Sequence, residues 1–159
     1  MNILTPLQKN LLKYIGNSEL GKKFVWTGGT ALARRLEHRY SIDLDFFSEN
    51  LEAPEIFLSH INRLQKALAL KQIKYEEKLN RRLFIMEQEK EQIQLEFVYF
   101  PFSPIEKPKK DAEFDIRIDS LIDIAVNKIL SSYQRKEPKD AYDLYVLCAK
   151  KKFNLKKLI

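Results

Sequence analysis

The sequence predicts an α+β domain in which a small mixed β-sheet is flanked by helices. Helix and strand patterns alternate at the start of the chain, three strand patterns follow in succession, and two helical patterns close it. The 159 residues, 45% of them hydrophobic, suffice for one hydrophobic core. We therefore expect a single domain over residues 1–159, with a sheet-bearing core over about 1–118 and a helical C-terminal part over about 119–159.

The first half of the chain alternates between helical and extended patterns. Thr5 is a typical N-cap and Pro6 a typical first helical residue. Pro54 opens a longer amphipathic pattern, in which apolar residues recur every three or four positions. The elements expected here are a helix over 5–15, a strand over 23–27, a helix over 30–37, a strand over 42–47 and a helix over 54–70.

The second half places strand patterns before its two helices. The most regular alternation puts Ile93, Leu95 and Phe97 on one face of a strand. Asp119 is a candidate N-cap for the helix that follows it. The elements expected here are strands over 72–76, 82–87, 92–99 and 114–118, helices over 120–133 and 138–150, and a turn near 155–158.

The composition limits the classes of function. The net charge is +6 and the isoelectric point about 9.3, which is typical of proteins that meet polyanions such as nucleic acid or nucleotides. A solvated surface that keeps the protein soluble explains the same charge. The single cysteine, Cys148, excludes an intrachain disulfide and a cysteine metal site. Because there is neither a signal-peptide pattern nor a long apolar stretch, we expect a cytoplasmic protein without membrane contact.

Two aspartates lie in the fourth expected element. Alternation places Asp43 and Asp45 on one face of the strand, with their Cα atoms roughly 6.6–6.8 Å apart. Ile42, Leu44 and Phe46 would then face the core. Carboxylates at this spacing can bind one hard cation such as Mg²⁺. The alternative is an exposed pair without a ligand.

A glycine pair lies between an expected strand and an expected helix. Gly28 and Gly29 let the backbone approach a ligand closely, and the N–H groups at the start of the helix, beside Thr30, can bind phosphate. No Gly-Lys-Ser/Thr follows, so this is not a P-loop. The alternative is a tight turn that binds nothing.

The glycines and the aspartates together form a family pattern. Residues 24–50, FVWTGGTALARRLEHRYSIDLDFFSEN, resemble the first motif of the AbiEii/AbiGii toxin family of nucleotidyltransferases, which have a DNA polymerase β-like fold. That motif is Gly-Gly-Thr-Ala-Leu followed by His-Arg-x-Ser-x-Asp-Leu-Asp-Phe-Phe, and the chain matches both parts and the gap between them. The resemblance implies that a nucleoside triphosphate is held by Gly28, Gly29 and Thr30, and magnesium by Asp43 and Asp45.

A third carboxylate is implied on a neighbouring strand. Glu96 is the candidate, because it is the only acid in the apolar half of its strand and faces away from Leu95 and Phe97. Residues 95–102, LEFVYFPF, also resemble the corresponding strand of the family. Glu96 would hold a second metal ion or activate the attacking hydroxyl. A solvent-facing strand residue is the alternative.

A lysine continues the apolar stripe of the helix expected over 120–133. Lys128 lies four residues after Ile124 and seven after Leu121, on a face that should be buried. Either its stem carries the ammonium out to water, or the ammonium meets an anion. Residues 123–147 resemble the late motif of the family, a lysine-bearing helix, then Arg, then Lys-Asp-x-x-Asp-Leu. This resemblance implies that Lys128 contacts triphosphate oxygens.

Four further residues of the late motif are candidates. Asp140 suits the first turn of its helix, whereas Asp143 lies too far inside the helix to act as a cap. The resemblance implies a catalytic role beside Lys128 for this pair, and the sequence does not choose between them. Arg135 and Lys139 are expected to hold phosphate or RNA backbone, or to pair with these acids.

The resemblance covers about residues 24–147 and implies transfer of a nucleoside monophosphate (NMP) from an NTP to a hydroxyl acceptor. Two Mg²⁺ ions would assist, with Mn²⁺ as the alternative metal. An RNA acceptor such as the tRNA 3′ end, a toxin role and a cognate antitoxin are also implied. Two interpretations stay open: a catalytically degenerate regulator that binds nucleotide or RNA, and a nucleotidyltransferase for a protein or small-molecule acceptor. A small polar acceptor favours an acidic pocket, which this basic chain fits less well.

Overall fold

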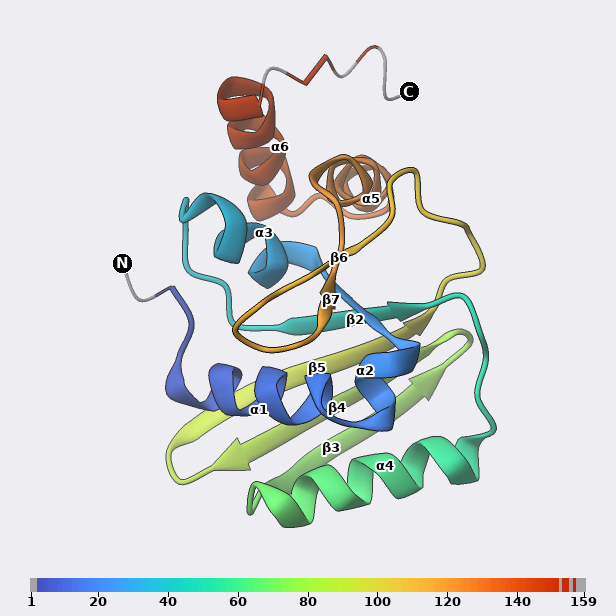
Figure 1. The fold of residues 1–159 in the computed structure, drawn as a ribbon. Helices are drawn as coiled ribbons and strands as arrows, with labels where there is room; N and C mark the ends of the chain where they lie inside the picture. Colours follow the sequence, from blue (N-terminus) through green and yellow to red (C-terminus); the bar gives the residue numbers. More distant parts are fainter. Residues whose placement is uncertain (1–2, 152, 155, 157–159) are drawn as a thin grey trace.

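The computed structural model describes residues 3–151, 153–154 and 156 (Figure 1). The turn expected near 155–158 therefore falls largely outside the described residues. The helices are α1 (Pro6–Gly16), α2 (Glu19–Lys23), α3 (Gly28–Leu36), α4 (Pro54–Ala67), α5 (Leu121–Gln134) and α6 (Pro138–Lys151). The strands are β1 (Val25–Thr27), β2 (Leu44–Ser48), β3 (Lys71–Lys78), β4 (Arg81–Gln88), β5 (Glu91–Tyr99), β6 (Lys109–Lys110) and β7 (Arg117–Ile118).

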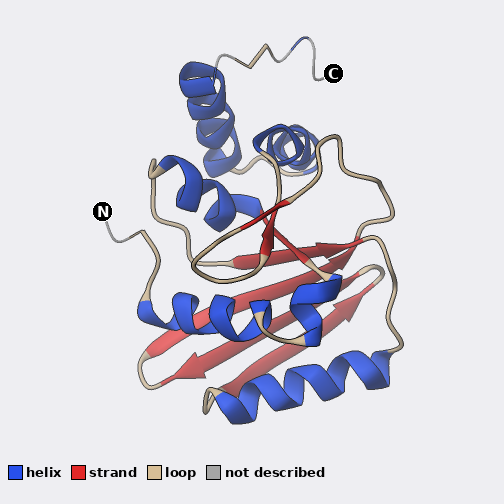
Figure 2. Cartoon of the chain, viewed as in Figure 1, coloured by secondary structure: helices blue, strands red, loops and turns tan. Residues whose placement is uncertain are grey.

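The strands form one seven-stranded sheet in the order β3-β4-β5-β2-β1-β7-β6. The β2–β5 and β1–β7 pairs are parallel, and the other pairs are antiparallel. Figure 2 shows helices flanking this sheet, with α5 and α6 gathered beyond its β1 side. The predicted α+β fold with a mixed sheet is thus confirmed.

One face of the sheet carries the hydrophobic core. In Figure 1, α1 and α4 lie in front of the strands, and they bury Leu11 and Phe57 completely. The Phe57 ring packs edge-on against Phe97, with ring centroids 5.1 Å apart. The alternation predicted for β5 is confirmed, because Ile93, Leu95 and Phe97 are all buried. The opposite face of the same strands carries Asp45 and Glu96 together with apolar side chains such as Val98.

The helix starts follow largely from the sequence. Thr5 caps α1 through a capping box, as its position before Pro6 predicts. The N-cap of α5 is Ser120, whose hydroxyl accepts the N–H of the third helical residue, 3.0 Å away. The prediction of Asp119 as the cap was wrong, because the Asp119 carboxylate accepts a hydrogen bond of 2.9 Å from Thr27 in β1.

Two short elements were not predicted, and one expected strand is shorter than the sequence suggests. The helix α2 has only 5 residues and the strand β6 only 2, too few to show a period. The strand expected over 114–118 is reduced to β7, while Phe114 and Ile116 fill the core. Within the described part of the chain, no helix has the length and apolarity needed to cross a membrane.

The register of the strands aligns polar residues across the sheet. Glu96 of β5 lies opposite Leu83 of β4 on one side and opposite Asp45 of β2 on the other. Asp45 in turn lies opposite Thr27, the last residue of β1. Neighbouring strands are about 4.8 Å apart. The two carboxylates therefore come from adjacent backbones, next to the turn that follows β1.

Candidate active site

A cleft of about 540 Å³ opens over the face of the sheet that carries the aligned carboxylates. Its floor is formed by β2 and β5, and its walls by the turn after β1, the start of β4, and the helices α5 and α6. The structure brings most predicted site residues to this cleft: Gly28, Gly29, Asp43, Asp45, Glu96, Lys128, Arg135 and Lys139. Three do not line it: Thr30, Asp140 and Asp143.

The turn between β1 and α3 brings backbone against a carboxylate. Gly28 has a φ of 76°, which residues with a side chain rarely adopt. A Cβ at this position would overlap the carboxylate of Asp45. The Thr30 hydroxyl donates to the carbonyl oxygen of Asp43, which ties the loop before β2 to α3. The free N–H groups of the first turn of α3 therefore lie beside the carboxylates, where they can bind phosphate.

We expect Gly28→Ala to reduce the rate of nucleotide transfer by roughly tenfold or more, because the new Cβ would displace the Asp45 carboxylate. The positive φ of Gly28 also costs about 1–2 kcal/mol when the residue has a side chain, so the turn itself would be destabilised. The rate of transfer and the melting temperature would be measured together. Gly29→Ala is the comparison within the same turn, since its Cβ would meet only side-chain atoms, 2.6 Å from Nη2 of Arg39 and 3.0 Å from Oγ of Ser41, and its φ is not positive. Equal losses in both variants would contradict a special role for Gly28.

The segment that carries Asp43 differs from the prediction. Asp43 precedes β2, and its Oδ2 lies 3.8 Å from Nζ of Lys139. Leu44 and Phe46 are fully buried as predicted. Ile42 is 69% exposed, so the prediction that it faces the core was wrong. The reason is that strand pairing begins only at Leu44, so the alternation does not extend back to Ile42.

The carboxylates on the cleft floor repel one another. Burial raises the pKa of Asp45 to about 7, and the charges of Glu96 and Asp43 act in the same direction. Lys128 and Arg135 act against this rise, but they do not cancel it. The ionised form of Asp45 is therefore disfavoured in the cleft, chiefly because the side chain is buried.

The donor set suits a divalent cation, because Asp43, Asp45 and Glu96 offer only carboxylate oxygens. A cation would also relieve the repulsion at Asp45. Among the described residues, however, no three His, Cys, Asp or Glu side chains are gathered closely enough to hold a metal ion. Glu96 instead accepts a hydrogen bond from Nε of Arg81, and Asp43 faces Lys139. Metal binding by all three carboxylates thus stays a prediction.

A buried charge network stands behind the cleft wall. Lys128 is only 6% exposed, and its Nζ lies 2.7 Å from Oδ1 of Asp140 and 2.9 Å from Oδ2 of Asp143. Of the two alternatives for Lys128, its ammonium meets an anion and does not reach water. Asp140 also accepts a hydrogen bond of 3.1 Å from Nε of Arg135. Although burial opposes it, the pairing with Lys128 and Arg135 lowers the pKa of Asp140.

Asp143 is the centre of this network and is fully buried. Arg39 donates to both carboxylate oxygens, at 2.6 and 2.7 Å, and His38 Nε2 lies 2.7 Å from Oδ1. Burial alone would raise the pKa of Asp143, but Arg39, His38 and Lys128 together hold it well below its ordinary value. The first motif and the late motif are therefore joined through one carboxylate.

Sequence reasoning missed two arginines of the site. Arg39 carried a signal, since it belongs to the family pattern, but its bidentate pair with Asp143 was not predicted. Arg81 carried none, because its contact with Glu96 arises from the pairing of β4 with β5. The sequence left open whether Arg135 and Lys139 pair with Asp140 and Asp143. Arg135 pairs with Asp140, whereas Lys139 lies beside Asp43 instead.

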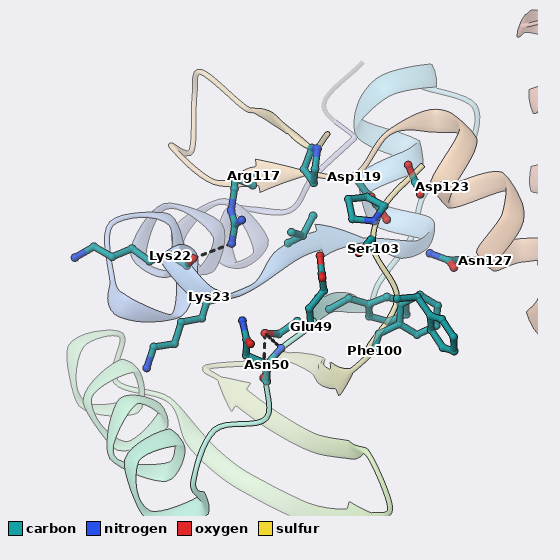
Figure 3. Close-up of a pocket in the computed structure, with 16 residues that line it drawn as sticks. Lys22, Lys23, Glu49, Asn50, Phe100, Ser103, Arg117, Asp119, Asp123 and Asn127 are labelled. Atoms are coloured by element: carbon teal, nitrogen blue, oxygen red, sulfur yellow. Dashed lines mark hydrogen bonds between the residues drawn. The ribbon is translucent and has the colours of Figure 1, made fainter. Parts of the chain in front are cut away.

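A second cavity, also of about 540 Å³, adjoins the cleft and shares Phe47, Phe100 and Asn127 with it. Figure 3 shows Asp119 and Asp123 on its wall, beside Asn127. Burial raises the pKa of Asp119 to about 6, and the charge of Asp123 adds to the rise. The ionised form of Asp119 therefore opposes folding.

The pH dependence of folding stability should show the cost of ionised Asp119. Its folded pKa lies above its unfolded value, so its cost is absent below about pH 4, grows up to about pH 6 and is then constant. We expect the stability of Asp119→Asn relative to wild type to improve by roughly 2 kcal/mol between pH 4 and pH 8. Urea unfolding measures this difference, and the exposed Glu137→Gln is the control. A difference that does not change with pH would contradict the prediction.

Solved structures share this fold. A crystal structure of an H. pylori protein, described as a candidate nucleotidyltransferase, matches with a TM-score of 0.69 and 21% identity, over 96% of this chain and 70% of that one. The solution structure of the antibiotic-resistance factor ANT(2'')-Ia matches with a TM-score of 0.62 and 14% identity, over 98% and 89%. At these identities the matches show a shared fold, which is of nucleotidyltransferase type.

The family of the chain is narrower than the class that its fold indicates. The chain belongs to the family of AbiEii nucleotidyltransferase toxins of type IV toxin–antitoxin systems, whose pattern matches residues 10–159. An uncharacterised protein of Aquifex aeolicus (strain VF5), aq_aa25, is 30% identical over 158 residues, which are 99% of this chain and 73% of that protein. The predicted resemblance is therefore confirmed. Membership makes the chain an NTP-dependent enzyme that transfers NMP, and a toxin whose family implies an antitoxin.

Proposed function

We propose that this chain transfers NMP from an NTP to the 3′ hydroxyl of an RNA, such as a tRNA, and releases pyrophosphate with the help of divalent metal ions. One observation carries the proposal. Three features lie side by side across the sheet, namely the turn at Gly28, the Asp45 carboxylate and the Glu96 carboxylate. In this order the turn would bind phosphate, Asp45 would bind metal, and Glu96 would contact the attacking hydroxyl.

The triphosphate would lie between the glycine turn and the α5–α6 wall. The N–H groups at the start of α3 face the cleft, and the cations Lys128, Arg135 and Lys139 line its far side. All three cations lie next to aspartates in the free protein, so incoming phosphate oxygens would compete with acids that are already bound. Asp140 and Asp143 would act by holding Lys128 and Arg135 in place rather than by touching substrate.

The carboxylates Asp43, Asp45 and Glu96 would hold Mg²⁺ or Mn²⁺. When bound, the metal supplies charge neutralisation for the phosphates and a lower pKa for the attacking hydroxyl. The protein contributes the fixed backbone of β2 and β5, which keeps Asp45 and Glu96 opposite each other. Glu96 would accept a proton from the hydroxyl that attacks the α-phosphate.

An RNA acceptor fits the charge of the chain. The net charge of +6 favours a polyanion over a cationic small molecule. The cations near the cleft are bound to acids, so they favour a substrate that brings its own negative charge to exchange for those acids. The chain spans 73% of its relative from Aquifex aeolicus.

The test is transfer from each of the four α-labelled NTPs to total tRNA with Mg²⁺. We expect label on RNA from one preferred NTP, loss of label with EDTA, and recovery with added Mg²⁺ or Mn²⁺. If the protein binds NTP in a metal-dependent way but leaves the RNA unlabelled, the proposal that RNA is the acceptor would be overturned. Label on protein in the absence of RNA would favour a protein acceptor instead.

A further inference from the structure

Arg81 occupies the wall of the cleft that faces away from the triphosphate side. It is the first residue of β4, and it lies opposite Val98 of β5, two residues beyond Glu96 on the same face. The cations Lys128 and Lys139 come from the opposite wall, on α5 and α6. Across the sheet the order is therefore arginine, carboxylates and glycine turn. Two separate cationic walls suit a reaction with two phosphate-bearing substrates.

The Arg81 side chain is both held and accessible. Its Nε donates to Oε1 of Glu96, and the side chain of Glu96 is only 12% exposed. The Arg81 side chain itself is 55% exposed, so its guanidinium can be reached from solvent. A guanidinium has five N–H donors in a planar fork, and this contact uses the Nε–H. The group can therefore exchange Glu96 for another anion without being taken out of water.

We propose that Arg81 binds the phosphodiester next to the acceptor hydroxyl and so selects the 3′ end of a nucleic acid strand. The proposal rests on the proposed function and names how its acceptor is recognised. In the free protein the Glu96 carboxylate occupies the place of that phosphate. When the acceptor binds, Arg81 moves to the phosphate, and Glu96 is released towards Asp45 and the attacking hydroxyl.

The chemistry of an RNA end supports this role. The nucleotide that carries the 3′ hydroxyl also carries a phosphate on its own 5′ oxygen, a fixed few bonds away. An arginine fork binds such a phosphate through two parallel N–H···O bonds, which a lysine cannot reproduce. A hydroxyl on a nucleoside, a protein or a small neutral molecule brings no phosphate and leaves Arg81 on Glu96. Only an acceptor with this phosphate would therefore release Glu96 from Arg81.

The experiment compares Arg81→Ala and Arg81→Lys with wild type on two acceptors, a short single-stranded oligoribonucleotide and its 3′-terminal nucleoside. We expect Arg81→Ala to raise the KM for the oligonucleotide roughly ten- to hundredfold, with the KM for NTP unchanged. The rate of transfer to the nucleoside should not fall in Arg81→Ala, because this variant lacks the guanidinium that binds Glu96 in the wild type. The KM of Arg81→Lys for the oligonucleotide should lie between those of wild type and Arg81→Ala. Arg63→Ala, an exposed arginine on α4 at the other face of the sheet, is the matched control.

The outcomes separate this proposal from the function on which it rests. A lower kcat with both acceptors and an unchanged KM would show that Arg81 only positions Glu96, and would overturn the proposal. Wild-type protein that labels no RNA would overturn the proposed function. In that case the affinity of the protein for a fluorescent oligoribonucleotide, measured by anisotropy without NTP, still tests the role of Arg81. Weaker binding by Arg81→Ala than by wild type would support the phosphate contact, and equal binding would overturn it.

Discussion

Replacing Asp45 by alanine is expected to lower the rate of nucleotide transfer at least about a thousandfold, since a metal-binding carboxylate at the reacting phosphate contributes several kcal/mol. Asp45 lies opposite Glu96 on the adjacent strand and beside the glycine turn, so no other described residue occupies this point of the cleft floor. The assay is transfer from the preferred α-labelled NTP, with the melting temperature measured on the same samples.

The fold should survive this substitution. Burial raises the pKa of Asp45, and Glu96 and Asp43 add to the rise, so the ionised carboxylate opposes folding when no metal is present. We therefore expect Asp45→Ala to melt at the same or a higher temperature in EDTA. The control is Glu113→Ala, an exposed acid paired with Arg34, which should keep full activity. Activity above a few per cent in Asp45→Ala would exclude Asp45 from the reaction.

Asp143→Asn is expected to destabilise the fold by roughly 3–5 kcal/mol, because it removes the carboxylate charge that pairs with Arg39 and with the buried Lys128. For a chain of this size the melting temperature would fall by about 10 °C or more. Thermal unfolding at neutral pH measures the effect. Glu113→Gln is the matched control, since its partner Arg34 is on the surface and the pair is worth less than about 1 kcal/mol.

The same variant has a second, pH-dependent readout. Arg39, His38 and Lys128 hold the pKa of Asp143 below its unfolded value. The stability that Asp143 contributes is therefore fully present above about pH 5 and is lost as the pH falls below about 4. The difference between wild type and Asp143→Asn should shrink in acid. A difference that stays constant down to pH 3 would mean that shape, not charge, sets the role of Asp143.

Hydrophobic periodicity predicted most of the fold. The buried face of β5 and the cap at Thr5 are local properties of the chain, and both were predicted correctly. The burial of Lys128 also follows from a local pattern, the apolar stripe of its helix. The N-cap at Ser120 was missed by one residue, because Asp119 is used by a strand far away in the sequence.

The geometry of the site depends on contacts that no local pattern contains. The sequence placed Asp45 and Glu96 on the polar faces of two strands, but their alignment depends on the register of β2 against β5. The contact between Arg81 and Glu96 depends in addition on the β4–β5 hairpin. The sequence proposed a catalytic role for Asp143, whereas the structure gives it three charged or polar partners, two of which lie more than 100 residues earlier.

These long-range contacts have a consequence for the making of a toxin. The parallel β1–β7 pair joins strands about ninety residues apart, and the anchor of Lys128 is supplied by α6, the last helix described. Contacts between distant parts of a chain form late in folding. While the ribosome is still synthesising α6, the nascent chain has Asp43 and Asp45 but lacks Asp140 and Asp143, the counter-charges of Lys128. We therefore expect the α5–α6 wall of the cleft to form only once α6 has emerged from the ribosome.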